Sequence, residues 1–441
     1  MKVEFCGAGS RDPDNWQASS SRLVNCYREA SQGKTGHVIK SDLGTTAFSS
    51  VSGVFFRAMA EIEGNLYVSC GSALHKIDVS GGAVSLGATA DSAEASIAGN
   101  NGDVTLCVGG NYYVWDGASL STPSAGAFSS FGSLDYVGNY TVLTELNGRR
   151  FQWSGLADAG TLPGLNFSSA DGRDDKIIRG AAIGGVFYIF KEKSHEVWYN
   201  TGESGANAFQ RQAGGVVDTG LKSFGLFAKV PGASAFFVGA DNRVYIVQVG
   251  PVSIPPVETA IKTQNPERCL CWEDEGHTMC AIIFRDAPAW VYDVATGEWH
   301  ERAQGVDLEP WQAADSAKLG DSWYVGKSGG EVLKMLRSNA DGSQPLVRSM
   351  VSRTLENDGQ YISIGELEVF ARIGWAAGNV MMRLSKDSGH TWGQWRTKSW
   401  SVGEYNKRLI WRALGQARQW TAEIRVSDPA EFPIKIGRAH V

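Results

Sequence analysis

A strand–turn–strand unit that recurs along most of the chain is the feature that most constrains its fold. Within each half of the unit, apolar and polar residues alternate, which is the pattern of a half-buried β-strand. Gly-Gly, Asn-Gly or Asp-Asn stands at the turns and predicts tight hairpins. Seven copies are present: "GNLYVSCGSALHKID" (64–78), "GDVTLCVGGNYYVWDG" (102–117), "GNYTVLTELNGRRFQWSG" (138–155), "GGVFYIFKEKSHEVWYNTG" (184–202), "ASAFFVGADNRVYIV" (233–247), "HTMCAIIFRDAPAWVYD" (277–293) and "DSWYVGKSGGEVLKML" (321–336).

The copies follow one another at a nearly constant distance. Equivalent residues, namely Tyr67, Leu106, Val142, Phe187, Phe236, Ile282 and Trp323, are separated by 39, 36, 45, 49, 46 and 41 positions. One blade of a β-propeller takes about 40–50 residues, and blades stacked around an axis bury the faces that a single small sheet leaves exposed. The spacing therefore predicts an all-β fold with a β-propeller of seven blades, or of six if one copy is an excursion. Two β-sandwiches are the alternative, since they also contain many short strands.

The composition and the periodicity of the sequence change on both sides of the repeats. Residues 1–48 are polar with little periodicity, so we expect an extended N-terminal arm, and residues 49–340 form the expected propeller. Residues 341–441 contain longer alternating segments, such as "SIGELEVFARIG" and "WTAEIRVSDP", which predict a small C-terminal domain resembling a β-sandwich. The last six residues, "IGRAHV", match the translation of a common sequencing adapter. One interpretation is a tail that is not native, and a natural terminus is the other.

Charge and cysteine content argue against several classes of protein. The net charge is -6 and the Lys and Arg residues are scattered, so we expect no dedicated nucleic-acid surface. Seven scattered cysteines do not form the pattern of a disulfide framework, which predicts folding in a reducing cytosol. The N-terminal "MKVEFCGAGSRDPDNW" lacks the apolar stretch of a signal peptide. With no long apolar run in the sequence, we also expect no membrane anchor.

The segment "SKDSGHTWGQW" contains an Asp-box, S-x-D-x-G-x-T-W, formed by Ser385, Asp387, Gly389, Thr391 and Trp392. Asp387 can accept hydrogen bonds from the backbone of its own turn, Gly389 permits a backbone angle that a side chain resists, and we expect Trp392 to anchor the hairpin in the core. Such boxes are best known from sialidases, so a sugar-binding or sialidase-like propeller is the alternative function. A sialidase also needs an arginine cluster and a Tyr-Glu pair, which the spacing does not assemble here. We therefore predict a structural turn.

The other groups of potentially reactive residues do not match the spacing of a known metal or phosphate site. Cys269, Cys271, His277 and Cys280 lie within twelve positions, but their spacing is not that of a common zinc ribbon or knuckle, and a buried free cysteine can serve as a small hydrophobe. "GKT" at 33–35 is not a phosphate loop, because Arg28 stands where the loop needs glycine. We predict no catalytic, cofactor-binding or metal-ligating residues, no cofactor and no enzymatic activity.

Three segments, in order along the chain, carry a resemblance to a known family. The first is "RLVNCYREASQGK", with Arg22, Asn25 and Tyr27. The second is "SHEVWYNTG" followed by "GADNRVYIV", with Glu196, Trp198, Tyr199, Asn200, Arg243 and Tyr245. The third is "GEYNKRLIWRALGQAR" (403–418). From about residue 20 to residue 430 the chain resembles the packaged-DNA stabilisation proteins of short-tailed phages (podoviruses), also called tail hub or nozzle proteins.

The resemblance implies a structural virion protein of the phage tail, assembled in the cytoplasm of the bacterial host. Its partners would be further copies of itself in a ring, a hexamer by this resemblance, together with the portal and adaptor ring, the tail needle and the tailspike. Double-stranded DNA would pass through the lumen without specific binding. We expect a neutral to acidic lumen, because a basic lining would hold the phosphate backbone. We also expect the arm to order on a neighbouring subunit, and closure of the propeller within its own subunit is the alternative.

Overall fold

In the computed structural model, which describes residues 2–4, 10, 21–30, 37–91, 94–428 and 434–440, the chain is built almost entirely of β-strands. Strands account for 57% and helices for 3%. The longest helix of the described residues, α1 (Pro255–Thr263), has nine residues and is far too short to cross a membrane. The described residues also contain one short 3-10 helix, η1 (Gly205–Asn207). The predicted all-β class is therefore confirmed.

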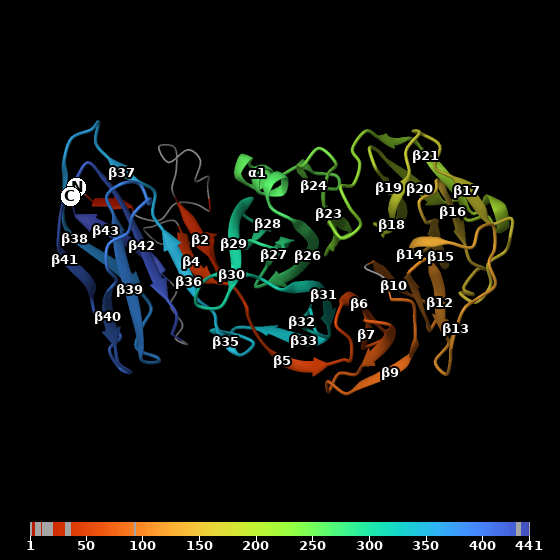
Figure 1. The fold of residues 1–441 in the computed structure, drawn as a ribbon, viewed down its shortest axis with the longest axis horizontal. Coiled ribbons are helices and arrows are strands. Elements are labelled where there is room, and N and C mark those ends of the chain that lie inside the picture. The colour runs from red at the N-terminus through yellow and green to blue at the C-terminus, as the bar shows by residue number, and fades with distance from the viewer. Residues whose placement is uncertain are drawn as a thin grey trace.

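Four-stranded sheets form the propeller (Figure 1). The first five are β6 (Phe56–Ile62), β7 (Asn65–Cys70), β8 (Ala73–Ile77) and β9 (Ala83–Ala88); β10 (Ala95–Asn100), β11 (Asp103–Val108), β12 (Asn111–Trp115) and β13 (Leu120–Ser121); β14 (Phe131–Val137), β15 (Tyr140–Glu145), β16 (Arg150–Trp153) and β17 (Phe167–Ser169); β18 (Ile177–Ile183), β19 (Val186–Lys191), β20 (His195–Asn200) and β21 (Phe209–Val217); and β22 (Phe227–Val230), β23 (Ser234–Val238), β24 (Val244–Ile246) and β25 (Gly250–Pro251).

Two further four-stranded units are continuous with strands outside the propeller. One contains β26 (Pro266–Asp274), β27 (His277–Phe284), β28 (Ala289–Asp293) and β29 (Glu298–Gln304), and the other β31 (Ala313–Leu319), β32 (Ser322–Lys327), β33 (Glu331–Leu336) and β5 (Gly44–Ser50). Each of the seven residues used above to measure the repeat lies in the second strand of its own unit. The hairpins read from the sequence are therefore the central hairpins of these sheets.

Turn chemistry and packing explain why these segments fold as blades. At the turn between β14 and β15, Gly138 and Asn139 have φ angles of 59° and 67°, which suits a type I′ hairpin turn. Neighbouring sheets bury each other's faces, as where Val142 and Phe151 of one sheet pack with Phe187 of the next. The first strands of most neighbouring sheets lie in contact, and β31 contacts β6 to complete the circle. The sheets β18–β21 and β22–β25 pack through buried side chains such as Phe190 and Phe237.

The circle is closed by the N-terminal segment of the same chain. Strand β5 pairs antiparallel with β33, so that Gly44 lies opposite Leu336 and Ser50 opposite Glu331. The last sheet thus combines one strand from the beginning of the chain with three from the end of the repeats. Two short strands, β34 (Ala340–Asp341) and β35 (Gln344–Pro345), extend this sheet, and β30 (Glu309–Pro310) pairs with β29.

The remaining strands form the predicted C-terminal sandwich. One sheet contains β36 (Arg348–Val351), β42 (Gln419–Val426), β39 (Gly378–Ser385) and β40 (Arg396–Trp400), with β37 (Leu355–Glu356) beside β42. The other contains β38 (Ile362–Ala371), β41 (Leu409–Ala417) and β43 (Ile434–His440). The buried side chains of Trp400, Trp411 and Trp420 lie in the core between the sheets.

The described parts of the expected arm are strands of both domains. Strand β2 (Arg22–Val24) lies between β29 of the propeller and β36 of the sandwich. Strands β3 (Cys26–Ala30) and β4 (His37–Ser41) extend the second sandwich sheet, and β1 (Lys2–Glu4) pairs with β43. These described residues pair with strands of their own chain. Residues 5–9, 11–20 and 31–36 lie outside the described residues.

Candidate functional site

The boundary between propeller and sandwich, here called the seam, is organised by Arg22, Asn25, Tyr27, Asp274 and Glu301. The first three belong to the N-terminal segment that resembled the phage family. The other two belong to β26 and β29 of the propeller. Strand β2 pairs with both domains at once, parallel to β29 at Val24 and antiparallel to β36 along its length.

Asn25 turns the chain between β2 and β3. Its φ angle is 55°, a left-handed conformation that asparagine tolerates better than most residues. Its side chain is fully buried; Nδ2 donates to the carbonyl of Val347 at 2.7 Å, and Oδ1 accepts from the backbone N–H of Ala303 at 2.9 Å. One side chain thus bonds the end of β29 to the segment that enters the sandwich.

Arg22 forms a two-pronged ion pair with Glu301. Nε donates to the two carboxylate oxygens at 2.8 and 3.0 Å, and Nη2 donates at 2.6 Å. The charge of Glu301, with a smaller contribution from Glu423 of the sandwich, raises the pKa of Arg22. Charge-assisted bonds of this geometry are among the stronger ones in proteins.

Tyr27 and Arg337 meet on the carboxylate of Asp274. The Tyr27 hydroxyl donates to Oδ2 at 3.1 Å and Arg337 Nη2 donates to Oδ1 at 2.8 Å. Burial raises the pKa of Asp274 to about 6, although Arg337 and Tyr27 act in the opposite direction. The same burial raises the pKa of Tyr27, so its hydroxyl keeps its proton and remains a donor.

Beneath these residues lies a second buried polar group. Asp42 lies 3.2 Å from His300 Nε2, and Arg302 Nη1 donates to the carbonyl of Leu43 at 2.5 Å. Burial acts to raise the pKa of Asp42, but the charges of His300 and Arg302 outweigh it and the pKa is lowered. The N-terminal segment is therefore held to the propeller by charges as well as by strand pairing.

The mid-chain family positions lie elsewhere in the propeller. Glu196 is fully buried in β20, where it accepts from Lys191 Nζ at 3.2 Å and from Trp198 Nε1 at 3.3 Å. Lys191 also bonds Asp175 at 2.9 Å and the carbonyls of Ala170 and Arg173 at 2.9 and 2.7 Å. Because the Lys191 ammonium group has oxygen partners on several sides, we assign it a role in the stability of the fold.

The other family positions hold turns. Asn200 Nδ2 donates to the carbonyl of Gly138 in the neighbouring sheet at 3.0 Å, and the partly exposed Tyr199 bonds Gln210. In β24, the Tyr245 hydroxyl donates to Asp241 at 2.6 Å, while Arg243 lies 3.7 Å from Glu258. The nine family positions thus fall into separate groups at the seam, around β20 and around β24. They do not form one reactive site.

The Asp-box forms a self-contained turn between β39 and β40. Asp387 accepts from the backbone N–H of Thr391 at 2.8 Å and from its hydroxyl at 2.5 Å, and Ser385 donates to Asp387 at 2.6 Å. Gly389, with a φ angle of 97°, donates to Ser385 at 2.8 Å. Despite the cost of desolvation, these bonds lower the pKa of Asp387 to about 2. Its oxygens are thus engaged inside the turn.

Trp392 differs from the expectation that it anchors the hairpin in the core. It lies partly exposed against the guanidinium of Arg383, 4.8 Å from the ring centre, and Trp395 lies on the same guanidinium at 4.4 Å. Arg383 in turn donates to the buried Glu423 at 2.6 Å. The hairpin is therefore held by cation–π contacts on the outer face of the sheet, which the local sequence does not reveal.

The cysteine and histidine group has no shared centre. Cys271 and Cys280 face each other across β26 and β27 with sulfur atoms 2.7 Å apart, whereas His277 bonds Asp293 at 2.8 Å. Burial raises the pKa of the Cys269 and Cys271 thiols, which disfavours the thiolate that a metal needs. Within the part of the chain that the structure describes, no three such side chains come together as metal ligands.

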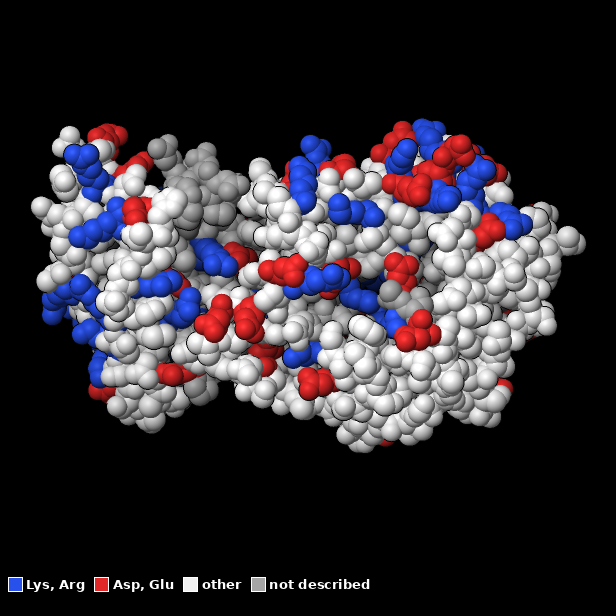
Figure 2. Space-filling model, viewed as in Figure 1, with Lys and Arg blue, Asp and Glu red and all other residues white. Residues whose placement is uncertain are grey.

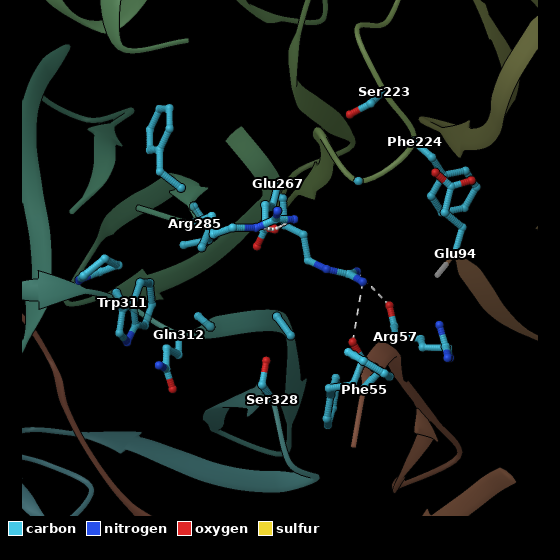
Figure 3. A pocket seen from close by; sticks show the side chains of 18 of the residues that line it. Phe55, Arg57, Glu94, Ser223, Phe224, Glu267, Arg285, Trp311, Gln312 and Ser328 are labelled. Atoms are coloured by element: carbon cyan, nitrogen blue, oxygen red, sulfur yellow. Dashed lines mark hydrogen bonds and ion pairs between the residues drawn. The ribbon is translucent and has the colours of Figure 1, made fainter. Parts of the chain in front are cut away.

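A cavity of 1120 Å³ is lined by residues of several propeller sheets (Figure 3). Phe55, Phe224 and Trp311 line it together with charged residues that are partly paired, such as Arg57 with Asp91 and Arg285 with Glu267. Arg268 donates to the carbonyl of Arg57 at 2.8 Å. Burial lowers the pKa of the nearby Arg179, while the charges of Asp315 and Asp135 act in the opposite direction. Charges of both signs compensate one another here.

Two family models match the chain from near its beginning to its end. The model described as "Bacteriophage P22 Gp10, beta-propeller" matches residues 9–341, and "Bacteriophage P22 Gp10, beta-sandwich" matches residues 347–441. This chain belongs to the bacteriophage P22 Gp10 family. That family contains the podovirus tail hub and DNA stabilisation proteins, so the resemblance found in the sequence is confirmed. The P22 Gp10 relationship also makes the chain a structural protein of a phage tail.

Comparisons outside the P22 Gp10 family give only distant similarity. No curated protein sequence matches the chain significantly. Among solved structures, BamB from Moraxella catarrhalis is 10% identical with a TM-score of 0.41, covering 76% of this chain and 96% of its own. The computationally designed Ika8 protein is 12% identical with a TM-score of 0.40, covering 66% and 99%. Scores this low carry no argument about function.

The seam residues of the propeller could not be found from the sequence. Arg22 and Glu301 are 279 positions apart, and neither Glu301, Asp274 nor Arg337 stands in a local motif. Arg22, Asn25 and Tyr27 were singled out by the family resemblance, which gave no partners for them. Their partners follow only from the insertion of β2 between the domains.

Proposed function

We propose that this protein is the tail hub, or nozzle, subunit of a short-tailed phage. Copies of the chain assemble as a ring, a hexamer, beneath the portal and its adaptor ring. The ring retains the packaged DNA and forms the conduit for its ejection, and it supports the tail needle and the tailspike. The protein resides in the virion tail, is assembled in the cytoplasm of the bacterial host, and has no catalytic activity.

One observation carries this proposal: both parts of the P22 Gp10 family match in order, over residues 9–341 and 347–441. The seam supports it physically. A conduit under the pressure of packaged DNA needs domains that do not swing, and strand β2 pairs with both domains while Asn25 and Arg22 bond across the boundary. A sialidase-like function gains no support from the Asp-box, whose carboxylate is engaged in its own turn.

The net charge of -6 suits passage of DNA better than binding. A lumen rich in Lys and Arg would bind phosphate through counterion release and retain the duplex in a salt-dependent manner. We therefore propose that the surface facing the lumen is neutral to acidic.

Reconstitution tests the proposal. The purified chain is mixed with the portal and adaptor proteins of the same phage and examined by electron microscopy, where a ring beneath the adaptor is expected. A fluorogenic sialoside serves as the counter-assay and should not be hydrolysed. A chain that binds neither portal nor adaptor but hydrolyses the sialoside contradicts the proposal, and so does submicromolar, salt-sensitive binding of duplex DNA to the assembled ring.

A further inference from the structure

Cys271 and Cys280 face each other on neighbouring strands of the propeller. They lie directly opposite in the antiparallel pair of β26 and β27, and the Cys271 thiol donates to the Cys280 sulfur at 2.7 Å. The buried Cys107, by contrast, donates to the carbonyl of Phe131 at 3.4 Å. Cys271 and Cys280 therefore have each other as partners, which is the arrangement from which a disulfide forms.

The register of the hairpin gives this pair the backbone spacing of a disulfide. Glu275 and Gly276 form the two-residue turn, and their φ angles of 47° and 88° suit type I′. The residues that flank such a turn are a hydrogen-bonded pair, and the two kinds of pair alternate from there. Cys271 and Cys280 stand three pairs further along, in a non-hydrogen-bonded pair, whose Cα atoms lie about 4.5 Å apart. Disulfides join Cα atoms that are roughly 4.4–6.8 Å apart.

The two sulfurs lie in an apolar layer inside the propeller. Both cysteines belong to the buried cluster that joins sheets β22–β25 and β26–β29 and that includes Val238 and Trp290. Figure 2 shows charged side chains of both signs on the exterior of the molecule, well away from such a layer. Burial raises the pKa of the Cys271 thiol, so the reactive thiolate is scarce and the thiol is oxidised slowly. A small, uncharged oxidant is therefore the kind that reaches the pair.

We propose that Cys271 and Cys280 are a redox-active dithiol, which a peroxide converts into a disulfide between β26 and β27. A phage particle leaves the reducing cytosol of its host when the cell lyses, and disulfides persist in oxidising surroundings. The reaction needs only the folded chain and a peroxide. It therefore goes beyond the proposed function and does not depend on ring assembly or on the retention of DNA.

With hydrogen peroxide the reaction takes two steps. The first sulfur attacks one peroxide oxygen and the O–O bond breaks; the sulfur gives up two electrons and becomes a sulfenic acid, and the other oxygen leaves as water with the thiol proton. The second sulfur then attacks the sulfenic sulfur and the S–O bond breaks; hydroxide leaves as water with the second thiol proton. Two thiols and one hydrogen peroxide thus give one disulfide and two waters. Because the second sulfur is already in contact, this closure precedes oxidation to a sulfinic acid.

The disulfide fixes a hairpin that takes part in the seam. Strand β26 ends at Asp274, which accepts from Tyr27 and Arg337, and Cys271 stands three positions before it. A disulfide stabilises a protein mainly by restricting the unfolded chain, and a short closed loop such as 271–280 gives a small effect. We expect the oxidised chain to melt about 2–3 °C higher than the reduced chain.

The test uses the full-length chain, which is reduced, freed of reductant, treated with hydrogen peroxide and unfolded for a count of its thiols. The wild type has seven cysteines and is expected to fall to five thiols, seven less the two in the disulfide, and dithiothreitol should restore all seven. A tryptic digest localises the change, because the peptide 269–285 contains Cys269 as well as the pair. That peptide should lose two hydrogen atoms and keep one thiol for alkylation. The rate should rise with pH, since the thiolate is the reactive form.

Four variants show which cysteines react. Cys271→Ala and Cys280→Ala each remove one partner, so the loss of two hydrogen atoms from this peptide should disappear. Cys269→Ala leaves the pair intact and should react as the wild type does. Cys107→Ala, which removes a buried cysteine from a different sheet, is the matched control and should also form the disulfide.

The outcomes decide the proposal in either direction. Wild-type chain that keeps all its thiols, or that gains a sulfinic acid in place of the disulfide, overturns it. So does a disulfide that Cys269→Ala abolishes and Cys271→Ala leaves, because Cys269 and Cys280 are then the partners. If an alanine variant is insoluble, the oxidised wild-type chain still decides: cleavage after Glu273 leaves two fragments joined only by the disulfide, and their fragmentation spectrum identifies the cysteines. An oxidised chain that melts no higher than the reduced chain overturns the stabilising role.

Discussion

Arg22 and Glu301 form a bidentate ion pair across the boundary between the sandwich and the propeller, with donor–acceptor distances of 2.6 to 3.0 Å. The two residues lie 279 positions apart. Arg22 sits on the strand that pairs with β36 of the sandwich, and Glu301 sits on the last strand of a propeller sheet. The ion pair and the shared strand therefore act on the same boundary, and their combined effect is to fix the angle between the domains.

Asn25 is the residue whose loss should weaken the seam most. Asn25→Gly keeps the left-handed backbone accessible but leaves the carbonyl of Val347 and the N–H of Ala303 without their partners. We expect a loss of about 2–6 kcal/mol, since each of the two buried groups left unsatisfied costs roughly 1–3 kcal/mol. Asn25→Ala should lose about 1 kcal/mol more, because alanine resists this conformation. Thermal unfolding monitored by calorimetry measures both, and equal melting temperatures for the two variants would contradict the role of the backbone angle.

Lys191 should tolerate replacement poorly. Lys191→Met leaves the buried Asp175 without its cation and leaves Glu196 only Arg211, at 3.6 Å. Breaking a buried ion pair from one side costs about 3–5 kcal/mol. We expect a strongly lowered melting temperature and a reduced yield of soluble protein. Lys193→Met, two positions away on an exposed side chain, is the matched control and should behave as the wild type. A melting temperature for Lys191→Met equal to that of the control would show that the ion group contributes nothing.

Arg383 should hold the Asp-box hairpin to the sheet. In Arg383→Ala, Trp392 and Trp395 lose the guanidinium that lies against both of them, and Glu423 loses one of its donors. Each of the two cation–π contacts is worth about 0.5–2 kcal/mol, so we expect a loss of about 1–4 kcal/mol and a shift of tryptophan fluorescence towards that of solvent-exposed indole. Arg353→Ala, a substitution of an exposed arginine on the same domain, is the control. Fluorescence that does not change in Arg383→Ala would contradict the stacking.

The alternation of apolar and polar residues and the turn residues were enough to predict the propeller, because both strands of a hairpin and its turn are consecutive in the sequence. Alternation and turn residues predicted the hairpins that contain Tyr67 and Trp323, which the structure shows to be in the second strands of their sheets, and the regular spacing predicted the circular arrangement. The sandwich followed from the same signal in longer strands. Each inference needed only neighbours in the sequence.

The strand pairing of the N-terminal segment and the contacts at the seam could not be predicted from local patterns. Strand β2 has three residues, too few for alternation to be visible, and its partners are determined by where the two domains meet. The polar character of this segment predicted an extended arm, and its described residues include ion pairs such as that of Arg22 with Glu301. Trp392 was expected in the core because tryptophan is apolar, but the position of Arg383 decides where its ring lies.

Asp274 should make the stability of the seam depend on pH. Its pKa of about 6 in the folded chain lies above the ordinary value of 3.8, so the folded state binds the proton more tightly and stability falls as pH rises from about 4 to about 6. Asp274→Asn, which still accepts from Tyr27, removes this dependence. The melting temperature of the variant relative to the wild type should therefore rise over that interval, by the equivalent of up to about 3 kcal/mol at 1.36 kcal/mol per pKa unit, and then level off. Asp321→Asn, at an exposed carboxylate, should follow the wild type at every pH, and a parallel course for Asp274→Asn would contradict the assignment.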